Sequence, residues 1–481
     1  MNRLPLVLVL AVALVCVLAA PALAGPRTFV VTPSHVDDTA ALQQAFDAAV
    51  AAGPGSVVKL TAGKFYTNEI LVDGFDGCFK GAGMHRTVID TRRGRDPAAP
   101  GVKLVMDPDD TSVPLFGWTS LIAFLQSDVR VADMSFDITA EQPCELWKAW
   151  GSEWYHLSDV FIVTRDSRSS FDRVGFTAHD GELNGSNLDG AAEIFETSGT
   201  HRVTRCSFRG GNDGLETGGI TGGGLVVGGR PGMGNTFDLA GTPCAMTNYS
   251  DSRVEISYNR MSTLYGEGVW VNQGAGAVTA DGLPALPASR YLIHHNSITA
   301  GKIEFGDGSV YGAGGVLLED DSSLLGEPSR LRAVVAHNCI TLDNNGLDGG
   351  VNGVGAQGVR VIGNRIRGIG IAGIDAGTDI YGFWGFPWGP GCGWRIIGND
   401  VSKVHPVNNV VLDGPAAQVW LGAKSSHCLV VGGCARTEVL DEGVDNILIH
   451  VTELVTGGAV RSLGASRAPL AGKALMLSQK F

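Results

Sequence analysis

Ala336-His337-Asn338-Cys339-Ile340 is one copy of a short element that recurs along this chain. Each copy reads hydrophobic-x-hydrophobic-x-x-Asn-x-hydrophobic, and it is followed by a turn and by a strand that begins with glycine. The other copies that contain the asparagine are Ser257-Tyr258-Asn259-Arg260-Met261, His294-His295-Asn296-Ser297-Ile298, Ile362-Gly363-Asn364-Arg365-Ile366 and Ile397-Gly398-Asn399-Asp400-Val401. A repeat of this kind predicts a solenoid, in which every coil packs only on its two neighbours.

Earlier copies place Met134, Val174 and Cys206 at the asparagine position, and each has a phenylalanine two residues later. Connections between the strands are too short for crossover helices, which excludes α/β folds. We therefore predict an all-β parallel solenoid of about nine or ten coils at a spacing of ~4.8 Å. The repeated asparagine is expected to hydrogen bond to the coils above and below it, which is a structural role.

A helix is predicted over about residues 39–52, before the first coils. Its apolar face consists of Leu42, Ala45, Phe46, Ala49 and Val50. Asp38 or Thr39 is expected to be its N-cap, and Gly53-Pro54 should end it. We expect this helix to cover the open end of the first coil.

The residues around this helix resemble the N-terminal signature of the pectate-lyase-like (pectin lyase-like) superfamily. The matching stretches are Val36-Asp37-Asp38-Thr39-Ala40-Ala41-Leu42-Gln43, Ser56-Val57-Val58-Lys59-Leu60-Thr61-Ala62-Gly63-Lys64-Phe65-Tyr66, Phe79-Lys80-Gly81-Ala82-Gly83 and Thr87-Val88-Ile89. The resemblance implies a right-handed parallel β-helix. Members include lyases, glycoside hydrolases, epimerases, phage depolymerases and non-catalytic proteins, so the resemblance names no single reaction.

Residues 1–24 are predicted to be a signal peptide, because Arg3 precedes an apolar stretch and Ala22-Leu23-Ala24 fits a cleavage site. We expect a secreted or periplasmic protein, with the cell surface as a further location. Residues 25–460 should form one β-helix domain, and residues 461–481 a terminal cap or a disordered tail. No later stretch has the length of a membrane span, so no stable membrane insertion is expected after cleavage.

Removal of the predicted signal peptide takes away Arg3 and leaves 35 basic and 49 acidic residues, a formal net charge of −14. This charge argues against nucleic acid as a partner. A polysaccharide is the expected partner, and an acidic one would need a locally basic cleft or a bridging cation. Eight cysteines remain after removal of the signal peptide, an even number that permits disulfides in an oxidising compartment. Cys206 and Cys339 are expected to be buried free thiols instead.

Alignment of the glycine-led strands places Glu216, Trp270, Leu317 and Asp375 in one outward column. Two residues later it aligns Gly218, Asn272, Glu319 and Gly377. The candidate catalytic residues are Asp213, Glu216, Glu267, Glu319 and Asp375. The candidate substrate-binding residues are Trp270, Asn272, Trp384 and Trp388.

Carboxylates one coil apart would be separated by ~5 Å and two coils apart by ~10 Å. These separations bracket the retaining and inverting geometries of glycoside hydrolysis, and a tryptophan offers a sugar ring an apolar platform. The leading hypothesis is therefore an enzyme, a glycoside hydrolase that uses paired carboxylates. It requires no cofactor and no metal.

Two alternatives stay open. A uronate lyase or epimerase would need a base, with Ca²⁺ as a possible cofactor, but Lys302, Arg360 and His179 are not tied by sequence to the acidic column. The second alternative is a non-catalytic carbohydrate-binding or adhesin-like β-helix.

Residues 139–160 and 273–291 interrupt the coil spacing and are expected to overhang one face. His294 and His295 should point to opposite faces of a strand and so be unable to bind one metal together.

Overall fold

The computed structural model describes residues 25–462, apart from several segments. These segments are 92–118, 139–158, 179–191, 196–198, 211–212, 219–221, residue 240, 248–250, 274–287, 305–309, 321–328, 378–390, 408–416, 434–436 and 456–458. The predicted signal peptide, Trp384, Trp388, His179 and most of both predicted overhanging loops therefore lie outside the described residues. No helix of the described part is long and apolar enough to cross a membrane.

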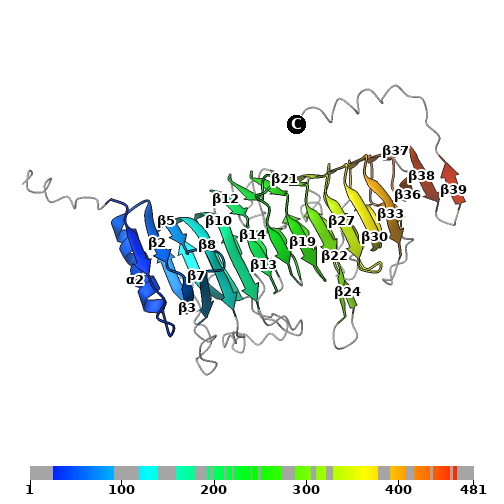
Figure 1. Cartoon of the computed structure of the whole chain (residues 1–481). Helices are drawn as coiled ribbons and strands as arrows, with labels where there is room; N and C mark the ends of the chain where they lie inside the picture. Colours follow the sequence, from blue (N-terminus) through cyan, green and yellow to red (C-terminus); the bar gives the residue numbers. More distant parts are fainter. Residues whose placement is uncertain are drawn as a thin grey trace, which may run out of the picture.

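The described chain winds into a right-handed parallel β-helix, which extends as a rod from α2 (Thr39–Ala52) to the last strands (Figure 1). Each complete coil contributes three strands to three faces. Faces 1 and 2 together form the 23-stranded sheet, and face 3 is the 14-stranded sheet. The predicted right-handed parallel β-helix is thus confirmed.

Face 1 is formed by β1 (Thr28–Val31), β2 (Ser56–Leu60), β5 (Asp76–Lys80), β8 (Asp128–Ile138), β10 (Arg168–Ala178), β12 (Thr200–Thr204), β15 (Gly224–Val227), β18 (Arg253–Ser257), β21 (Ser289–His294), β26 (Leu331–Ala336), β29 (Arg360–Ile362), β32 (Arg395–Ile397), β35 (Leu429–Val431) and β37 (Ile447–Ile449). Face 2 is formed by β3 (Gly63–Thr67), β6 (Thr87–Thr91), the second halves of β8 and β10, β13 (Ser207–Arg209), β16 (Thr236–Asp238), β19 (Arg260–Thr263), β22 (Ser297–Ala300), β27 (Cys339–Asp343), β30 (Arg365–Gly370) and β33 (Asp400–Pro406).

Face 3 is formed by β4 (Ile70–Asp73), β7 (Thr119–Leu125), β9 (Asp159–Arg165), β11 (Ala192–Phe195), β14 (Leu215–Gly218), β17 (Cys244–Thr247), β20 (Val269–Gln273), β25 (Val316–Asp320), β28 (Val351–Val354), β31 (Ala372–Ala376), β34 (Ala417–Leu421), β36 (Thr437–Asp441), β38 (Val451–Val455) and the antiparallel β39 (Ala459–Ser462). Its thirteen parallel strands exceed the nine or ten coils expected, and one of the additional coils is that of Asn235. A hairpin of β23 (Lys302–Glu304) and β24 (Val310–Gly312) projects between β22 and β25.

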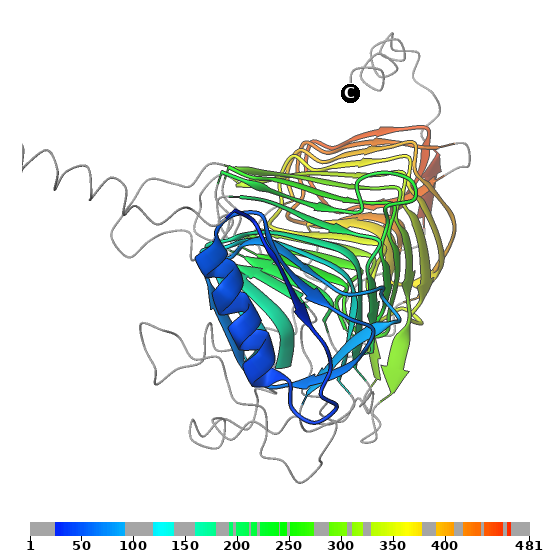
Figure 2. The same cartoon turned by 60° about the vertical axis from the view of Figure 1, so that its left-hand side comes forward.

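The helix α2 covers the end of the solenoid, as predicted (Figure 2). Its Phe46 is fully buried, and the Phe46 ring lies 5.0 Å from that of Phe79 and 5.5 Å from that of Phe75. Asp38 is the N-cap residue, but its carboxylate accepts hydrogen bonds from the backbone N–H groups of Ser34 and Tyr66 rather than capping the helix. The helix therefore seals the apolar core against water.

The predicted asparagine ladder forms at the turn between faces 1 and 2. The Nδ2 of Asn296 donates to the Oδ1 of Asn338 at 3.0 Å and to the carbonyl of Ile256 at 2.8 Å. The same pattern recurs from Asn259 to Asn364, and Asn399 continues it. All of these amides are nearly buried, so the ladder supplies partners that buried polar groups need.

One coil was not predicted from the sequence. Asn235 accepts a hydrogen bond from the N–H of Cys206 and donates its own N–H to Asn259, which makes it a further step of the ladder. This residue divides the interval of 53 residues between Cys206 and Asn259 into steps of 29 and 24. Phe237, two residues later, stacks on Phe208 at 4.5 Å and extends the predicted phenylalanine column.

Steric crowding explains why strands of face 3 begin with glycine. A Cβ added to Gly315 would lie 2.9 Å from Ile340 Cγ2, and one added to Gly350 would lie 2.7 Å from Ile366 Cγ2. The chain passes so close to the core here that only glycine fits.

Six cysteines of the described part are free thiols. Cys206 is buried as expected, and burial raises the pKa of its thiol to about 12. Cys339 is half-buried rather than buried, because it lies on the outer side of β27 beside Arg365.

Candidate functional site

The register of face 3 sets the candidate residues in two outward columns. Strand pairing aligns the first column as Glu216, Ala245, Trp270, Leu317, Asn352, Asp375 and Trp420. The second column, two residues later, contains Gly218, Thr247, Asn272 and Glu319. The sequence alignment of the outward residues was therefore correct, but it omitted the coils of Ala245 and Asn352.

Three candidate residues meet at the centre of this face. Trp270 Nε1 donates to Glu319 Oε2 at 2.9 Å, and Asn272 Nδ2 donates to the same oxygen at 3.1 Å. All three side chains are half-buried, and the Trp270 ring packs against the cluster of Leu317 and Val354. Two donors from β20 thus fix the carboxylate that β25 projects outward, beside an aromatic surface.

Asp375 lies on the same face but in a more enclosed position. Its neighbours Ile374 and Ala376 point into the core, so strand alternation turns Asp375 outward, yet only 2% of it is exposed. In the adjacent coil Asn352 donates to Asp348 Oδ1 at 2.6 Å, and both of these residues are also buried. A buried polar group therefore adjoins Asp375. Sequence reasoning did not find Asn352 or Asp348.

Asp213 and Glu267 lie at the edge of the face rather than on it. Asp213 Oδ1 accepts a hydrogen bond from the backbone N–H of Thr242 at 2.6 Å, which ties one coil to the next. Glu267 is half-buried and occupies the corresponding position two coils further along. The hydrogen bond between coils is a structural role that is sufficient to explain the presence of Asp213 at this position.

The spacing of the candidate acids differs from the expectation that paired carboxylates lie one or two coils apart in the same column. No two of the candidate acids occupy neighbouring coils of one column. Glu319 and Asp375 are two coils apart and offset by two residues, which separates their Cα atoms by ~12 Å. Glu193, which the sequence alignment missed, is the register partner of Glu216, so their Cα atoms are ~5 Å apart.

Trp420 adds a second aromatic residue to the first column. Its Nε1 donates to Glu442 Oε2 at 3.0 Å. The strand was not aligned from the sequence because Gln418 stands where the strands aligned from the sequence have glycine. Trp384 and Trp388 lie outside the described residues.

The prediction for His294 and His295 was wrong. Their Nδ1 atoms are 2.8 Å apart, because His295 adopts a φ of 55° at the turn and the chain there is no longer extended. Burial and the neighbouring His294 and His337 lower the pKa of His295. No group of three or more metal-binding side chains occurs within the described part of the chain.

Two of the basic residues weighed for a lyase do not belong to the strands of this face. Lys302 belongs to the β23–β24 hairpin, and Arg360 belongs to β29 on face 1. Within the described residues, the outward positions of face 3 from β14 to β31 hold no lysine, arginine or histidine.

Comparison with known proteins finds no matching family model and no matching curated protein. Solved structures do match. The A-module of mannuronan C-5 epimerase AlgE4 from Azotobacter vinelandii has 14% identity and a TM-score of 0.42 over 92% of this chain and 98% of that chain. The surface adhesin PfbA of Streptococcus pneumoniae has 11% identity and a TM-score of 0.44, with coverage of 89% and 93%.

A polygalacturonase from Erwinia carotovora has 11% identity and a TM-score of 0.38, with coverage of 91% and 97%. The strand register of this chain itself shows that it is a parallel β-helix. At these identities the likeness is one of fold and assigns no activity to the chain.

Proposed function

We propose that this protein is an exported glycoside hydrolase that cleaves a polysaccharide on the outer surface of face 3. Support comes first from Glu319, whose carboxylate is held by Trp270 and Asn272 at the centre of the face. A fixed carboxyl beside an aromatic ring combines one of the two carboxyls that glycoside hydrolysis uses with an apolar platform for a sugar. Export is supported by the sequence of residues 1–24 alone.

The second carboxyl of the proposed pair is Asp375. Its Cα separation of ~12 Å from Glu319 is too long for a retaining pair, whose carboxyl groups are ~5 Å apart. An inverting pair holds its carboxyl groups ~6.5–9.5 Å apart, which leaves room for the attacking water. Trp270 and Asn272 of β20 bind the Glu319 carboxyl on the side away from β31, so the proposal requires this carboxyl to turn toward Asp375 when the polysaccharide binds. In this proposal one carboxyl protonates the leaving oxygen, and the other removes a proton from that water.

The hydrolase is preferred to a lyase because the outward positions of face 3 from β14 to β31 hold acids but no base of the lysine or arginine type within the described residues. A lyase or epimerase would need such a base beside the carbon that loses its proton. The adhesin-like alternative predicts binding without cleavage.

The test is the release of new reducing ends from a panel of neutral and acidic polysaccharides. We expect wild-type protein to release them, and Glu319→Gln and Asp375→Asn each to lower the rate at least about a hundredfold. Glu304→Gln is the matched control, since Glu304 is an exposed acid on the β23–β24 hairpin and belongs to no strand of face 3. Silence across the panel, or equal rates in Glu319→Gln and the control, would reject the proposal.

The configuration of the first-formed product tests the assignment of the pair. Glu319 with Asp375 predicts inversion at the anomeric carbon, and retention would contradict this pair, because retaining enzymes hold their two carboxyl groups ~5 Å apart.

A further inference from the structure

Arginines form a track along face 1, on a different side of the solenoid from the proposed active site. Five consecutive coils, from β18 to β32, each place one arginine at an outward position. They are Arg253, Arg290, Arg332, Arg360 and Arg395. The first three are direct register partners, and the last two continue the track two residues to one side. At ~4.8 Å per coil, the track is ~19 Å long.

The charge of this track is poorly balanced. Arg253, Arg290, Arg332 and Arg395 are exposed, and none of them forms an ion pair within the described part of the chain. The only acid at an outward position of these five strands is Glu255, which contacts Ser257 and His294. Like charges opposite one another weaken a sheet, so the fold gains nothing from this arrangement.

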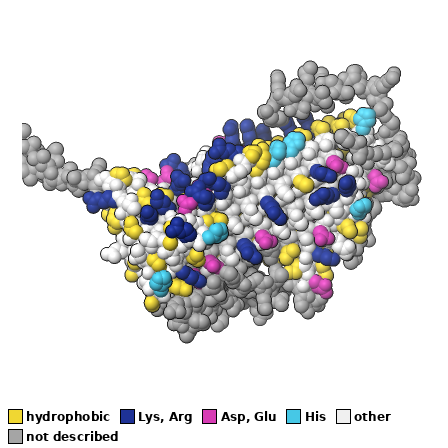
Figure 3. Space-filling view, viewed as in Figure 1, with side chains coloured by type: hydrophobic (Ala, Val, Ile, Leu, Met, Phe, Trp, Pro, Cys, Tyr) yellow, Lys and Arg dark blue, Asp and Glu magenta, His cyan; other side chains and the backbone are white. Residues whose placement is uncertain are grey.

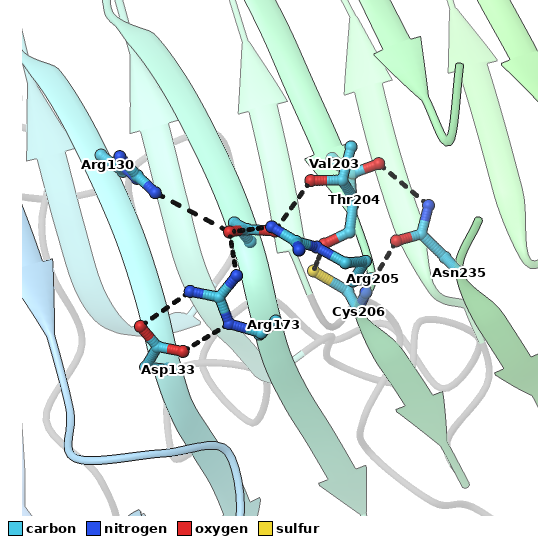
Figure 4. A network of polar contacts seen from close by, with 9 residues as sticks. Arg130, Asp133, Arg173, Val203, Thr204, Arg205, Cys206 and Asn235 are labelled. Carbon is cyan, nitrogen blue, oxygen red and sulfur yellow. Dashed lines mark hydrogen bonds and ion pairs between the residues drawn. The ribbon is translucent and has the colours of Figure 1, made fainter. Parts of the chain in front are cut away.

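At the turn between faces 1 and 2, earlier coils show how the chain balances arginine charges. Arg173 donates two hydrogen bonds to Asp133, which lowers the pKa of that carboxyl, and also one to Asp172 (Figure 4). Asp172 also accepts two hydrogen bonds from Arg205 and lies 3.8 Å from Arg130. The contrast between these neutralised arginines and the later track points to a ligand for the track. Basic side chains gather along the upper margin of the molecule, where β12 and β21 lie (Figure 3).

We propose that this track, from Arg253 to Arg395, binds a linear acidic polysaccharide that carries one carboxylate per sugar. The planar guanidinium matches a carboxylate with two parallel hydrogen bonds. Beside the arginines lies an apolar strip of Leu292, Val334, Ile362 and Ile397, of which Leu292 is 39% exposed. This strip offers contact for the C–H groups of sugar rings.

Nucleic acid fits the track less well. Duplex DNA carries one charge per ~1.7 Å of its axis, whereas the track offers one positive charge per ~4.8 Å. Single strands require aromatic side chains for base stacking, and the outward positions of these five strands include no phenylalanine, tyrosine or tryptophan. The overall charge of −13 also repels polyanions at a distance, so binding depends on the local track.

This inference does not rest on the proposed hydrolysis, because it concerns another face and predicts binding alone. A chain held on face 1 would tether the protein to an acidic polysaccharide, whichever polymer face 3 cleaves.

The test is affinity electrophoresis in gels that contain polygalacturonate, with a neutral polysaccharide and a single-stranded DNA as parallel ligands. We expect wild-type protein to be retarded by polygalacturonate, and an Arg290→Ala/Arg332→Ala double variant to bind about tenfold more weakly. An Arg365→Ala/Arg367→Ala double variant on β30 of face 2 makes the same change in net charge and is expected to bind within about twofold of wild type. Circular dichroism should show both variants folded, since all four arginines are exposed.

Three outcomes would overturn the proposal. They are the absence of retardation by polygalacturonate, equal loss of binding in the two double variants, and equally strong retention by single-stranded DNA. Wild-type protein that binds polygalacturonate but releases no reducing ends from any polysaccharide of the panel would reject the proposed hydrolysis and leave this inference standing.

Discussion

Replacement of Asn296 by alanine tests the ladder that holds successive coils together. The side chain of Asn296 makes four hydrogen bonds: its Oδ1 accepts from the N–H and the Nδ2 of Asn259, and its Nδ2 donates to Ile256 and Asn338. The residue is 2% exposed, so water does not replace these partners in the folded protein. At about 1 kcal/mol per bond, Asn296→Ala should lower the free energy of unfolding by about 4 kcal/mol.

Two measurements check this value. Urea unfolding followed by circular dichroism gives the change in stability, and hydrogen exchange reports on the backbone N–H of Asn259, which loses its acceptor and should lose protection. Ser297→Ala is the control, since Ser297 is exposed on the next position and should change stability by less than about 0.5 kcal/mol. A loss of less than about 1 kcal/mol in Asn296→Ala, with the Asn259 amide still protected, would refute the reasoning.

Three further changes test other parts of the structure. Burial lowers the pKa of His201 to about 4, so its imidazole is neutral in the folded protein above that pH. In the unfolded chain the same imidazole takes up a proton near pH 6.5. The free energy of unfolding should therefore fall by up to about 3 kcal/mol as the pH falls from 6.5 to 4. His201→Leu should reduce this pH dependence in urea titrations, and an unchanged slope would contradict the assignment. A Cβ at Gly353 would lie 2.0 Å from Trp394 Cζ2, so Gly353→Ala should destabilise the protein by roughly 1–3 kcal/mol, and an unchanged thermal midpoint would be inconsistent with this contact. Asp172→Asn removes the carboxylate shared by three arginines; because these arginines are partly exposed, the change should cost about 1–2 kcal/mol at neutral pH, whereas full stability in thermal unfolding would show that the network contributes nothing.

The fold could be predicted because its signal is local and repeated. Each asparagine occupies the same place in its coil, and the buried partners that it needs leave few alternatives. The coil of Asn235 escaped because its preceding strand, β15, ends in a glycine-rich loop that hides the hydrophobic pattern. The outward columns of face 3 followed from strand alternation once the glycines were aligned.

The contacts within the site could not be predicted in the same way. The bond from Trp270 to Glu319 joins residues 49 positions apart, and it depends on the direction that two long side chains take. The pairing of His294 with His295 depends on one positive φ, which the alternation rule does not anticipate. The arginine track could not be predicted from the net charge of the sequence, because arginines that are distant in sequence become neighbours only when the coils stack.

The measurement that tests the proposed function most directly is mass spectrometry of the oligosaccharides released in water labelled with the heavy oxygen isotope. A hydrolase incorporates one solvent oxygen into the products for each bond that it breaks, and we predict this label in the wild-type products and its loss in Glu319→Gln. Unsaturated products without the label would show that the protein is a lyase, and the absence of any released oligosaccharide would contradict the enzymatic proposal altogether.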